Sequence, residues 1–314
     1  AKTLAADFGS FTHSNILLSF RVPTVSKYLV SLTKEDILWD WADELGDCKF
    51  GTPKIRSRHE YEGSLERALF SLEQKSTPEI HLKIAPEIKM WKDLEVLYLW
   101  QQKDPAHRSV LPRSSDEKWK WFRLRMKGWQ KLNFWKESDD SVPDQPSLYE
   151  WLATPSRPIL FAAVLGDPIS HSWSPSEHRT FFAAQQLPFF AIKIKLEEWN
   201  QALSILERMG LQAAAVTSPL KSVAFQSCFQ TTDRAKELGA LNTLVRNQGK
   251  WFGDNTDWEG FQHILKNHEI LKCASVVVWG GGGTLQMIKS LLPNSQTFSS
   301  RSIQLPMEHF EILI

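Results

Sequence analysis

Cysteine is scarce in this chain of 314 residues, and its distribution excludes several architectures. The three cysteines, Cys48, Cys228 and Cys273, are odd in number and lie far apart along the sequence. They form neither a disulfide framework nor a metal-binding pattern. We therefore expect a reducing compartment, the cytoplasm, and no metal site.

Net charge and long apolar runs are lacking as well. The formal net charge is +1, which argues against a nucleic-acid binder that relies on a broad basic surface. No apolar run approaches the ~18 residues that a membrane-spanning helix needs. The first residues, AKTLAADFGS, resemble neither a secretion signal nor a transit peptide. The expected location is the cytoplasm, or the plastid if the source is a plant.

Tryptophan, in contrast, is abundant, with fourteen in the chain. Several lie in the basic and aromatic run EKWKWFRLRMKGWQKLNFWKE, residues 117–137. Such a run could stack on nucleic-acid bases, but its spacing favours half-buried strand and helix surface. We expect small-molecule partners, with neither nucleic acid nor membrane, and the oligomeric state stays open.

Strands and helices alternate on both sides of a proline-rich junction at residues 141–158. Before it, strand-like segments at 15–22, 53–59 and 79–85 are separated by helix-like segments at 64–75 and 93–104. After it, strand-like segments lie at 161–166, 189–195, 211–217, 241–246 and 275–280, and helical spacing at 196–210 ends on Gly210. This alternation predicts an α/β fold with parallel sheets on both sides. The expected domains are 1–156 and 157–314.

A glycine-rich turn lies between a β-branched strand and a helix in SVVVWGGGGTLQMIKSLL, residues 275–292. This context predicts a dinucleotide site, in which the turn and helix start face the pyrophosphate; the candidates are Gly280, Gly281, Gly282, Gly283 and Thr284. The next strand region, QTFSSRS, has no acidic residue to hold a ribose hydroxyl. It has Arg301, which suits the 2′-phosphate of NADP, although Arg301 is also compatible with a solvated surface arginine.

Small hydroxyl side chains gather in VLGDPISHSWSPSEH, residues 164–178, where a strand gives way to a helix. Ser174 and Glu177 fit a capping box, with Pro175 at the first helical position. A cap does not explain Ser172, which lies earlier on the loop. Hydroxyls at a helix start also suit an anionic or polyhydroxylated ligand, so both interpretations stay open.

Two further segments carry groups suited to carbonyl chemistry. AAAVTSPLK, residues 213–221, runs from a buried strand into a turn that presents Lys221. Asn255-Thr256-Asp257 could simply cap a helix. A lysine can also donate charge and a proton to a forming alkoxide, while an aspartate such as Asp257 orients the substrate hydroxyl.

Four motifs in order resemble shikimate dehydrogenase: AAVLGDPISHSWSPSEH, VTSPLK, GALNTL and GDNTDWEGF, followed by the glycine turn. The resemblance covers about residues 160–302. It implies a substrate subdomain at 157–262 and part of a Rossmann-like NADP-binding subdomain at 263–314. It further implies that Lys221 and Asp257 form the catalytic pair and that substrate is bound by Ser172, Ser174, Thr217, Asn242 and Asp257.

The chain departs from this family at two places. Ala215 stands where the family usually has asparagine, which removes one hydrogen-bond partner. Only 12 residues follow Ser302, so the rest of the family's nucleotide domain and its closing helix are not in this sequence.

The first part of the chain places His59 at a strand end and Lys83 inside an apolar strand, in KIRSRHEYEG and EIHLKIAPEI. Burial disfavours a charged lysine and so favours the neutral amine that attacks a ketone. A histidine beside the resulting imine can move protons. The alternative is an edge-strand lysine that faces solvent.

These segments resemble type I 3-dehydroquinate dehydratase, whose lysine forms an imine while its histidine moves protons. The resemblance implies that Lys83 and His59 are catalytic. It implies that carboxylate and hydroxyls are bound by Arg21, Ser141, Gln145 and a further arginine, for which Arg123 is the first choice and Arg125 the second; Glu44 is the candidate acidic residue. The implied fold is a (β/α)₈ barrel, incomplete because about 156 residues are available where roughly 200–250 are usual.

The expected activity is therefore bifunctional: 3-dehydroquinate is dehydrated, and 3-dehydroshikimate is then reduced to shikimate with NADPH. One alternative is a quinate- or shikimate-sensing regulator, or a pseudoenzyme, built from the same domains; Ala215 and the short nucleotide domain favour it. Another is a quinate dehydrogenase, which would share the site and differ in its contacts to ring hydroxyls.

Overall fold

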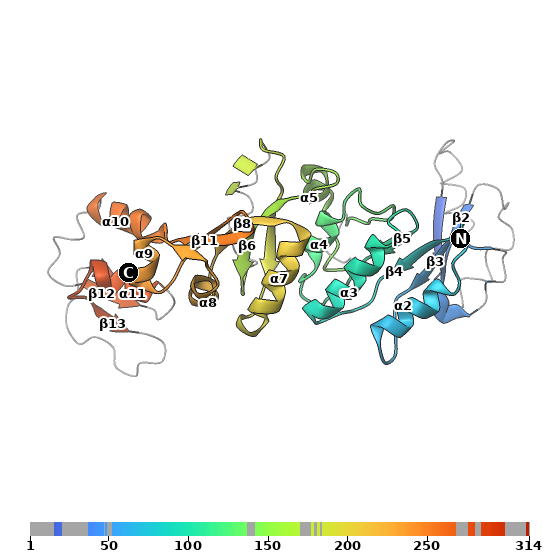
Figure 1. Cartoon of the computed structure of the whole chain (residues 1–314), viewed down its shortest axis with the longest axis horizontal. Coiled ribbons are helices and arrows are strands. Elements are labelled where there is room, and N and C mark those ends of the chain that lie inside the picture. The colour runs from blue at the N-terminus through green and yellow to red at the C-terminus, as the bar shows by residue number, and fades with distance from the viewer. Residues whose placement is uncertain are drawn as a thin grey trace. The chain divides into compact units, whose positions relative to one another are not determined.

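A computed structural model describes residues 16–20, 37–46, 48, 52–136, 142–169, 177–178, 181–182, 184–267, 276–279, 284–298 and 312–313. The chain divides into two compact units, Ala1–Arg157 and Pro158–Ile314. Each unit has its own sheets, so each is described separately below, and the elements are labelled in Figure 1.

The first unit is built on a parallel sheet of five strands in the order β1-β2-β3-β4-β5. The strands are β1 (Ile16–Phe20), β2 (Ile37–Ala42), β3 (Ile55–Arg58), β4 (His81–Ile84) and β5 (Arg108–Val110). Parallel strands in sequence order are the arrangement that successive β-α units of a barrel would have. The predicted (β/α)₈ barrel is nevertheless not confirmed, because the described residues form an open sheet with β1 and β5 at its edges.

Helices connect the parallel strands of this sheet. The helix α2 (Leu65–Glu73) lies between β3 and β4 and begins at Ser64, whose side chain accepts a hydrogen bond from the N–H of Arg67. The longer α3 (Trp91–Gln102) lies between β4 and β5, and Figure 1 shows α2 and α3 alongside the sheet. Their apolar faces are buried, as parallel crossovers require.

The centre of this sheet carries a lysine. All four residues of β4 are buried, and Lys83 is 0% exposed. Because β4 pairs with both β3 and β5, the alternative of a solvent-facing lysine on an edge strand is wrong. The register aligns Lys83 with Ser57 on β3 and Ser109 on β5, so polar side chains occupy one face of the sheet.

Most of residues 118–126 in the basic and aromatic run are buried in the core, whereas Trp135 is exposed. The run contains the short helix α4 (Lys120–Arg125). Trp119 and Trp121 are buried, and their rings lie 5.3 Å and 5.9 Å from the ring of Trp91. Since these rings already pack on one another, they are not available to stack on bases. The unit ends with α5 (Leu148–Ala153), which begins with a capping box of Ser147 and Glu150.

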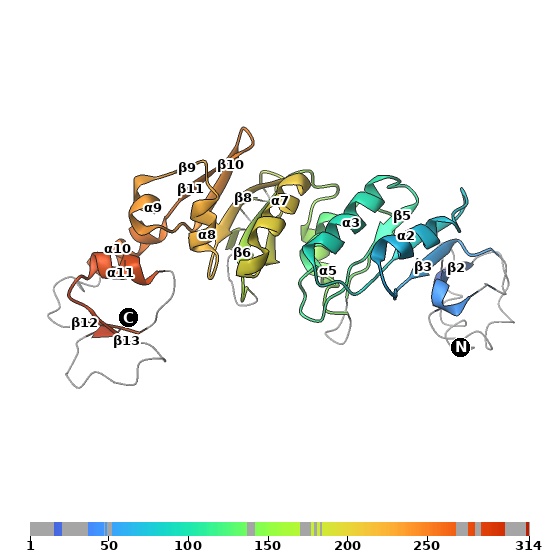
Figure 2. The same ribbon diagram turned by 60° about the horizontal axis from the view of Figure 1, so that its bottom comes forward.

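The second unit contains a mixed six-stranded sheet in the order β7-β6-β8-β10-β11-β9. Its strands are β6 (Phe161–Gly166), β7 (Phe189–Lys193), β8 (Leu211–Val216), β9 (Gln230–Thr231), β10 (Thr243–Asn247) and β11 (Lys250–Asp254), and Figure 2 shows β9, β10 and β11 together. Its helical elements are η3 (Leu196–Glu198), α7 (Trp199–Met209), α8 (Lys221–Gln226) and α9 (Asp233–Leu238).

The expectation of an entirely parallel sheet is wrong here. The strand β10 runs antiparallel to both β8 and β11. The reason is local: Gln248 and Gly249 have φ values of 47° and 77°, which form the tight turn of a β10–β11 hairpin. The predicted end of α7 is confirmed, since Gly210 has φ 104° and a left-handed conformation.

A smaller parallel sheet completes the second unit, in the order β13-β12-β14. Its strands are β12 (Val276–Trp279), β13 (Gln296–Phe298) and β14 (Ile312–Leu313), and its helices are α10 (Asp257–Asn267) and α11 (Leu285–Leu291). Buried Leu238, Trp258 and Met287 form a core cluster that joins α9, α10 and α11. Among the helices that the structure describes, none is long and apolar enough to cross a membrane.

Candidate functional site

The first candidate site lies in the second unit, on the edge of the six-stranded sheet that is formed by the carboxyl ends of its parallel strands. The adjacent parallel strands β6 and β8 both end there, at Gly166 and Val216. These ends are tightly apposed, because a Cβ added to Gly166 would lie 2.3 Å from Cγ2 of Thr217. Since β10 is antiparallel to β8, its first residues return to the same edge. Three loops therefore converge there, as is usual for ligand sites in α/β sheets.

A lysine, an aspartate and an asparagine meet at this edge. Lys221, the first residue of α8, contacts Oδ2 of Asp257, the first residue of α10. Asn242 donates from Nδ2 to the other carboxylate oxygen of Asp257 at 2.7 Å. The side chain of Lys221 is 13% exposed and that of Asp257 is 32% exposed. The three predicted residues are thus brought together in a partly open position.

The backbone fixes Asn242 in this position from several sides. Its carbonyl accepts a hydrogen bond from the N–H of Val216 at 2.7 Å, and its own N–H donates to the carbonyl of Asp254 at 3.0 Å. Its side-chain oxygen accepts from the N–H of Thr256 at 2.9 Å. Asn242 therefore links the ends of β8 and β11 to the start of α10.

The start of α10 is anchored by packing. Trp258 follows Asp257 and is buried against Leu238 and Met287. The guanidinium of Arg234 lies 3.8 Å from the centroid of the Trp258 ring, a cation–π contact. Asn255 is buried and donates to the carbonyl of Ala240 at 3.0 Å, so it is a structural residue. This packing holds Asp257 in place.

The remaining predicted substrate residues of this unit are only partly described. Thr217 lies at the same edge, and its N–H donates to the carbonyl of Leu165 at 2.9 Å. Ser172 and Ser174 lie outside the described residues. Ala215 packs against an apolar cluster of Ala162, Val164 and Phe189. Asparagine at Ala215 would therefore meet an apolar neighbourhood in this chain.

The predicted nucleotide turn is flanked by the expected elements. The strand β12 precedes it, α11 follows it, and β13 pairs parallel to β12. This strand–turn–helix–strand order fits a dinucleotide. Thr284 directly precedes α11 and makes no side-chain cap hydrogen bond. The turn itself, Gly280, Gly281, Gly282 and Gly283, lies outside the described residues, as does Arg301.

The second candidate site lies in the first unit, around Lys83. Its Nζ contacts Oδ2 of Asp40 on β2, and both side chains are 1% exposed. The same Nζ lies 5.6 Å from the centroid of the Phe134 ring. The buried amine therefore lies against a carboxylate, a partner that the sequence analysis did not anticipate.

His59 and Glu44 are brought together at the end of β3. The N–H groups of His59 and Glu60 donate to Oε1 of Glu44 at 2.7 Å and 2.9 Å, and His59 Nδ1 lies 4.0 Å from Oε2. Burial opposes ionisation of Glu44, but these hydrogen bonds outweigh it and lower the pKa of Glu44 to about 2. The other ring nitrogen of His59, Nε2, is buried and has no hydrogen-bond partner among the described residues.

Arg113 connects the His59 loop to the end of β4. It donates to the carbonyl of His59 at 3.0 Å and to that of Ala85 at 2.7 Å. Arg123 is buried and donates to the carbonyls of Leu111 and Pro112 at 3.1–3.2 Å. Both arginines thus brace the carboxyl ends of the strands.

The second-choice arginine, Arg125, is also buried. Burial lowers its pKa, and its guanidinium lies 5.8 Å from the ring of Trp129. The contacts of Arg123 and Arg125 given above are made to backbone carbonyls and to an aromatic ring. Their assignment as substrate ligands stays a prediction.

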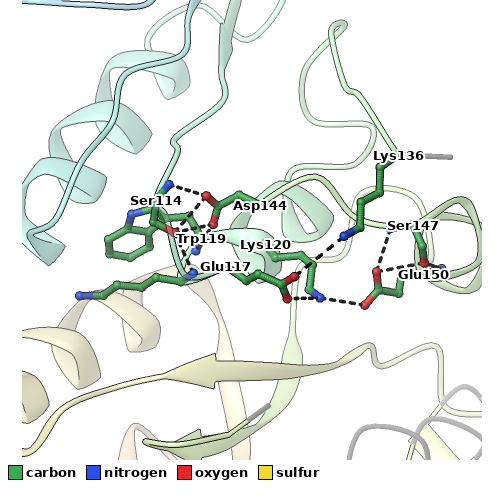
Figure 3. A network of polar contacts seen from close by, with 9 residues as sticks. Ser114, Glu117, Trp119, Lys120, Lys136, Asp144, Ser147 and Glu150 are labelled. Carbon is green, nitrogen blue, oxygen red and sulfur yellow. Dashed lines mark hydrogen bonds and ion pairs between the residues drawn. The ribbon is translucent and has the colours of Figure 1, made fainter. Parts of the chain in front are cut away.

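The loop that carries Gln145 is held by a polar network (Figure 3). Asp144 is fully buried and accepts hydrogen bonds from the hydroxyl and N–H of Ser114 and, at 2.7 Å, from the N–H of Trp119. Burial raises the pKa of Asp144, although these bonds and the charge of Arg123 oppose the rise. The network places the Gln145 loop beside α4. Ser141 and Arg21 lie outside the described residues.

Sequence reasoning missed Asp40 and its strand. In ILWDWA the residues alternate between the two faces of β2, and Asp40 falls on the face that Lys83 shares. An acidic residue at a core-facing strand position, beside a strand with a buried lysine, is the pattern that could have found it. Among the described residues, no group of His, Cys, Asp and Glu is suited to a metal ion.

Comparison with known proteins finds a family similarity within the second unit. Residues 164–244 match the family described as "Shikimate dehydrogenase substrate binding domain". The matched range contains Thr217, Lys221 and Asn242, which lie at the edge where β6 and β8 end. Residues 164–244 are therefore similar to the substrate-binding domain of shikimate dehydrogenases.

Particular relatives agree with this class. The shikimate dehydrogenase (NADP(+)) of Xanthomonas euvesicatoria pv. vesicatoria is 39% identical over 140 residues, which is 43% of this chain and 49% of that protein. The enzyme of the same name from Prochlorococcus marinus is 35% identical over 135 residues, which is 42% of this chain and 47% of that protein. The chain thus spans about half the length of the curated relatives that it matches.

Two solved structures are also similar in sequence to part of this chain. Shikimate dehydrogenase from Aquifex aeolicus is 30% identical, with a TM-score of 0.40 over 45% of this chain and 55% of that chain. Shikimate 5-dehydrogenase from Thermus thermophilus, in complex with NADP(H) and shikimate, is 30% identical, with a TM-score of 0.39 over 45% of this chain and 56% of that chain.

Proposed function

We propose that the second unit reduces 3-dehydroshikimate to shikimate with NADPH. The observation that carries this proposal is the convergence of Lys221, Asn242 and Asp257 at the edge where β6 and β8 end. The similarity to shikimate dehydrogenases named for NADP(+) supports the substrate and the cofactor.

The proposal gives each candidate residue of the second unit a distinct role. NADPH would be held by the turn between β12 and α11, with Arg301 on its 2′-phosphate, and when bound it supplies the hydride. Lys221 stabilises the negative charge that develops on the carbonyl oxygen and gives that oxygen a proton. Asp257 keeps Lys221 charged and orients a ring hydroxyl, while Asn242 and Thr217 bind further hydroxyls. Ser172 and Ser174 bind the carboxylate.

Replacement of Lys221 tests this proposal. We expect Lys221→Ala to lower kcat for reduction by about 10²–10⁴, the usual range for one positioned acid, with little change in substrate affinity. The control is Lys236→Ala, which removes an exposed lysine of α9. Unchanged reduction by Lys221→Ala would refute the assignment.

The same proposal gives the first unit a dehydratase activity on 3-dehydroquinate. Lys83 would form an imine with the substrate ketone, and His59 would move protons through the buried Nε2. The burial of Lys83 on a central strand supports this role, because buried ionisable side chains with a charged partner are frequent at functional sites. Arg123, Gln145, Arg21 and Ser141 would bind the substrate.

Chemical trapping tests the imine directly. Incubation with 3-dehydroquinate and borohydride should add one reduced ligand to a peptide that contains Lys83. Label on another peptide, or none in folded protein, would show that the imine assignment is wrong. If Lys221→Ala loses both dehydration and reduction, the proposal that the two reactions have separate active sites is wrong.

A sensing protein that binds these acids without turnover is the second candidate, favoured by Ala215 and its apolar surroundings. Binding of shikimate without NADP-dependent oxidation of it would support that candidate. Scarce cysteine supports a reducing compartment, the cytoplasm or the plastid of a plant.

A further inference from the structure

The contact between Lys83 and Asp40 spans two strands of the sheet that are not adjacent, on one buried face. Asp40 on β2 and Lys83 on β4 are separated by β3, whose Ser57 is aligned with Lys83. All three residues are at most 1% exposed. Among the described residues, His81 on β4 and Ser109 on β5 lie on the same face. His59 directly follows β3, and the ring of Phe134, in a loop, lies over Nζ of Lys83.

A buried imine needs more from its surroundings than a buried amine does. An ammonium can lose its proton and become neutral when burial destabilises its charge. An iminium must keep its charge, because the positive nitrogen is what withdraws electrons from the substrate. In a site with little water, that charge is stabilised only by groups already in place.

We propose that Asp40 is the counter-ion of the iminium that Lys83 forms with the substrate ketone; this rests on the dehydratase activity proposed above. Asp40 first takes one proton from the Lys83 ammonium. The neutral amine adds to the ketone carbon, the carbonyl π bond breaks, and one proton moves from the nitrogen to the oxygen, which gives a carbinolamine. Asp40 then returns its proton to the carbinolamine hydroxyl, which leaves as water. The nitrogen retains one proton as the iminium, and Asp40 is again a carboxylate beside it.

The test measures how borohydride trapping on Lys83 depends on pH in the full chain. Borohydride reduces an iminium much faster than a neutral imine. In the parent protein, Asp40 keeps the imine protonated, so the trapping rate should be nearly constant between about pH 6 and pH 8 once corrected for borohydride decay. In Asp40→Asn the proton must come from solvent, so the rate should fall by up to about tenfold for each pH unit of increase.

Two further variants separate this role from a purely structural one. Asp40→Glu retains the charge and should restore most of the flat pH profile. Ser57→Ala removes a buried polar group aligned with Lys83 but no charge, and its profile should match that of the parent. If Asp40→Asn does not fold, the comparison of Asp40→Glu with Asp40→Ser at equal folded fraction replaces it.

The possible outcomes are distinct. Trapping on Lys83 in the parent protein, with the same flat profile in Asp40→Asn, would overturn the counter-ion role and leave the imine intact. No trapping on Lys83 in the parent protein would overturn the dehydratase proposal itself. A steep profile in Asp40→Asn that Asp40→Glu flattens would support the inference.

Discussion

Asn242 donates a hydrogen bond from Nδ2 to Oδ1 of Asp257 at 2.7 Å, while Lys221 contacts the other oxygen of the same carboxylate. Asp257 is thus held at both oxygens, and its orientation does not depend on Lys221 alone. Hydrogen bonds to charged groups contribute more to stability than those between neutral groups.

Asn242→Ala should lower kcat/KM for reduction by about 10–100-fold, which corresponds to the loss of about 1.5–3 kcal/mol for a hydrogen bond to a charged group. The measurement is steady-state NADPH oxidation with 3-dehydroshikimate. Asn267→Ala, at the far end of α10, is the matched control and should behave like the parent protein. Equal kcat/KM for both variants would contradict the role of Asn242.

Stability at acidic pH should depend on Glu44. Its pKa in the fold is about 2, below the usual 4.5, so ionised Glu44 stabilises the fold above pH 4.5 and this contribution is lost as the pH falls toward 2. Glu44→Gln should lower the free energy of unfolding by on the order of 1 kcal/mol at pH 7, since the group is partly exposed. Urea titrations at several pH values measure this.

The difference between Glu44→Gln and the parent protein should shrink below pH 4.5 and vanish only below about pH 2, where Glu44 is protonated in both states. Glu62→Gln removes an exposed carboxylate close by and is the control. A constant difference at all pH values would show that ionisation of Glu44 is not the cause.

Asp144→Ala should destabilise the first unit by about 2–4 kcal/mol, because it leaves the buried N–H of Trp119 and the groups of Ser114 without their acceptor (Figure 3). Ser114→Ala removes one hydroxyl donor and should destabilise it by only about 1 kcal/mol. Denaturant titration followed by tryptophan fluorescence compares the two variants. Equal destabilisation would contradict a central role for the Asp144 carboxylate.

Cofactor preference should depend on Arg301. The parent protein should prefer NADP to NAD, and Arg301→Asp should abolish or invert that preference, since an acidic side chain repels the 2′-phosphate and can accept from a ribose hydroxyl. The ratio of kcat/KM for the two cofactors is the measurement. Equal use of NAD and NADP by the parent protein would remove the basis of this prediction.

Local patterns predicted many elements and part of each site. The convergence of Lys221, Asn242 and Asp257 was expected from the resemblance to shikimate dehydrogenase, because the motifs that carry this resemblance contain all three residues. Asp40 was missed, because its partner Lys83 lies two strands away and a contact across a sheet leaves no local pattern. The antiparallel β10 was missed for a related reason. Strand direction depends on the hairpin at Gln248 and Gly249, whereas apolar alternation is the same in either direction.

The position of the proposed reductive site in the sequence has an evolutionary consequence. Lys221, Asn242 and Asp257 lie within one uninterrupted stretch, 221–257, which includes α8, α9, β10 and β11. A genetic crossover on either side of this stretch would transfer the three groups together. Under the proposed function, exchange of the flanking segments would alter which acid or which nucleotide is accepted, whereas the three groups proposed for proton donation would be inherited together.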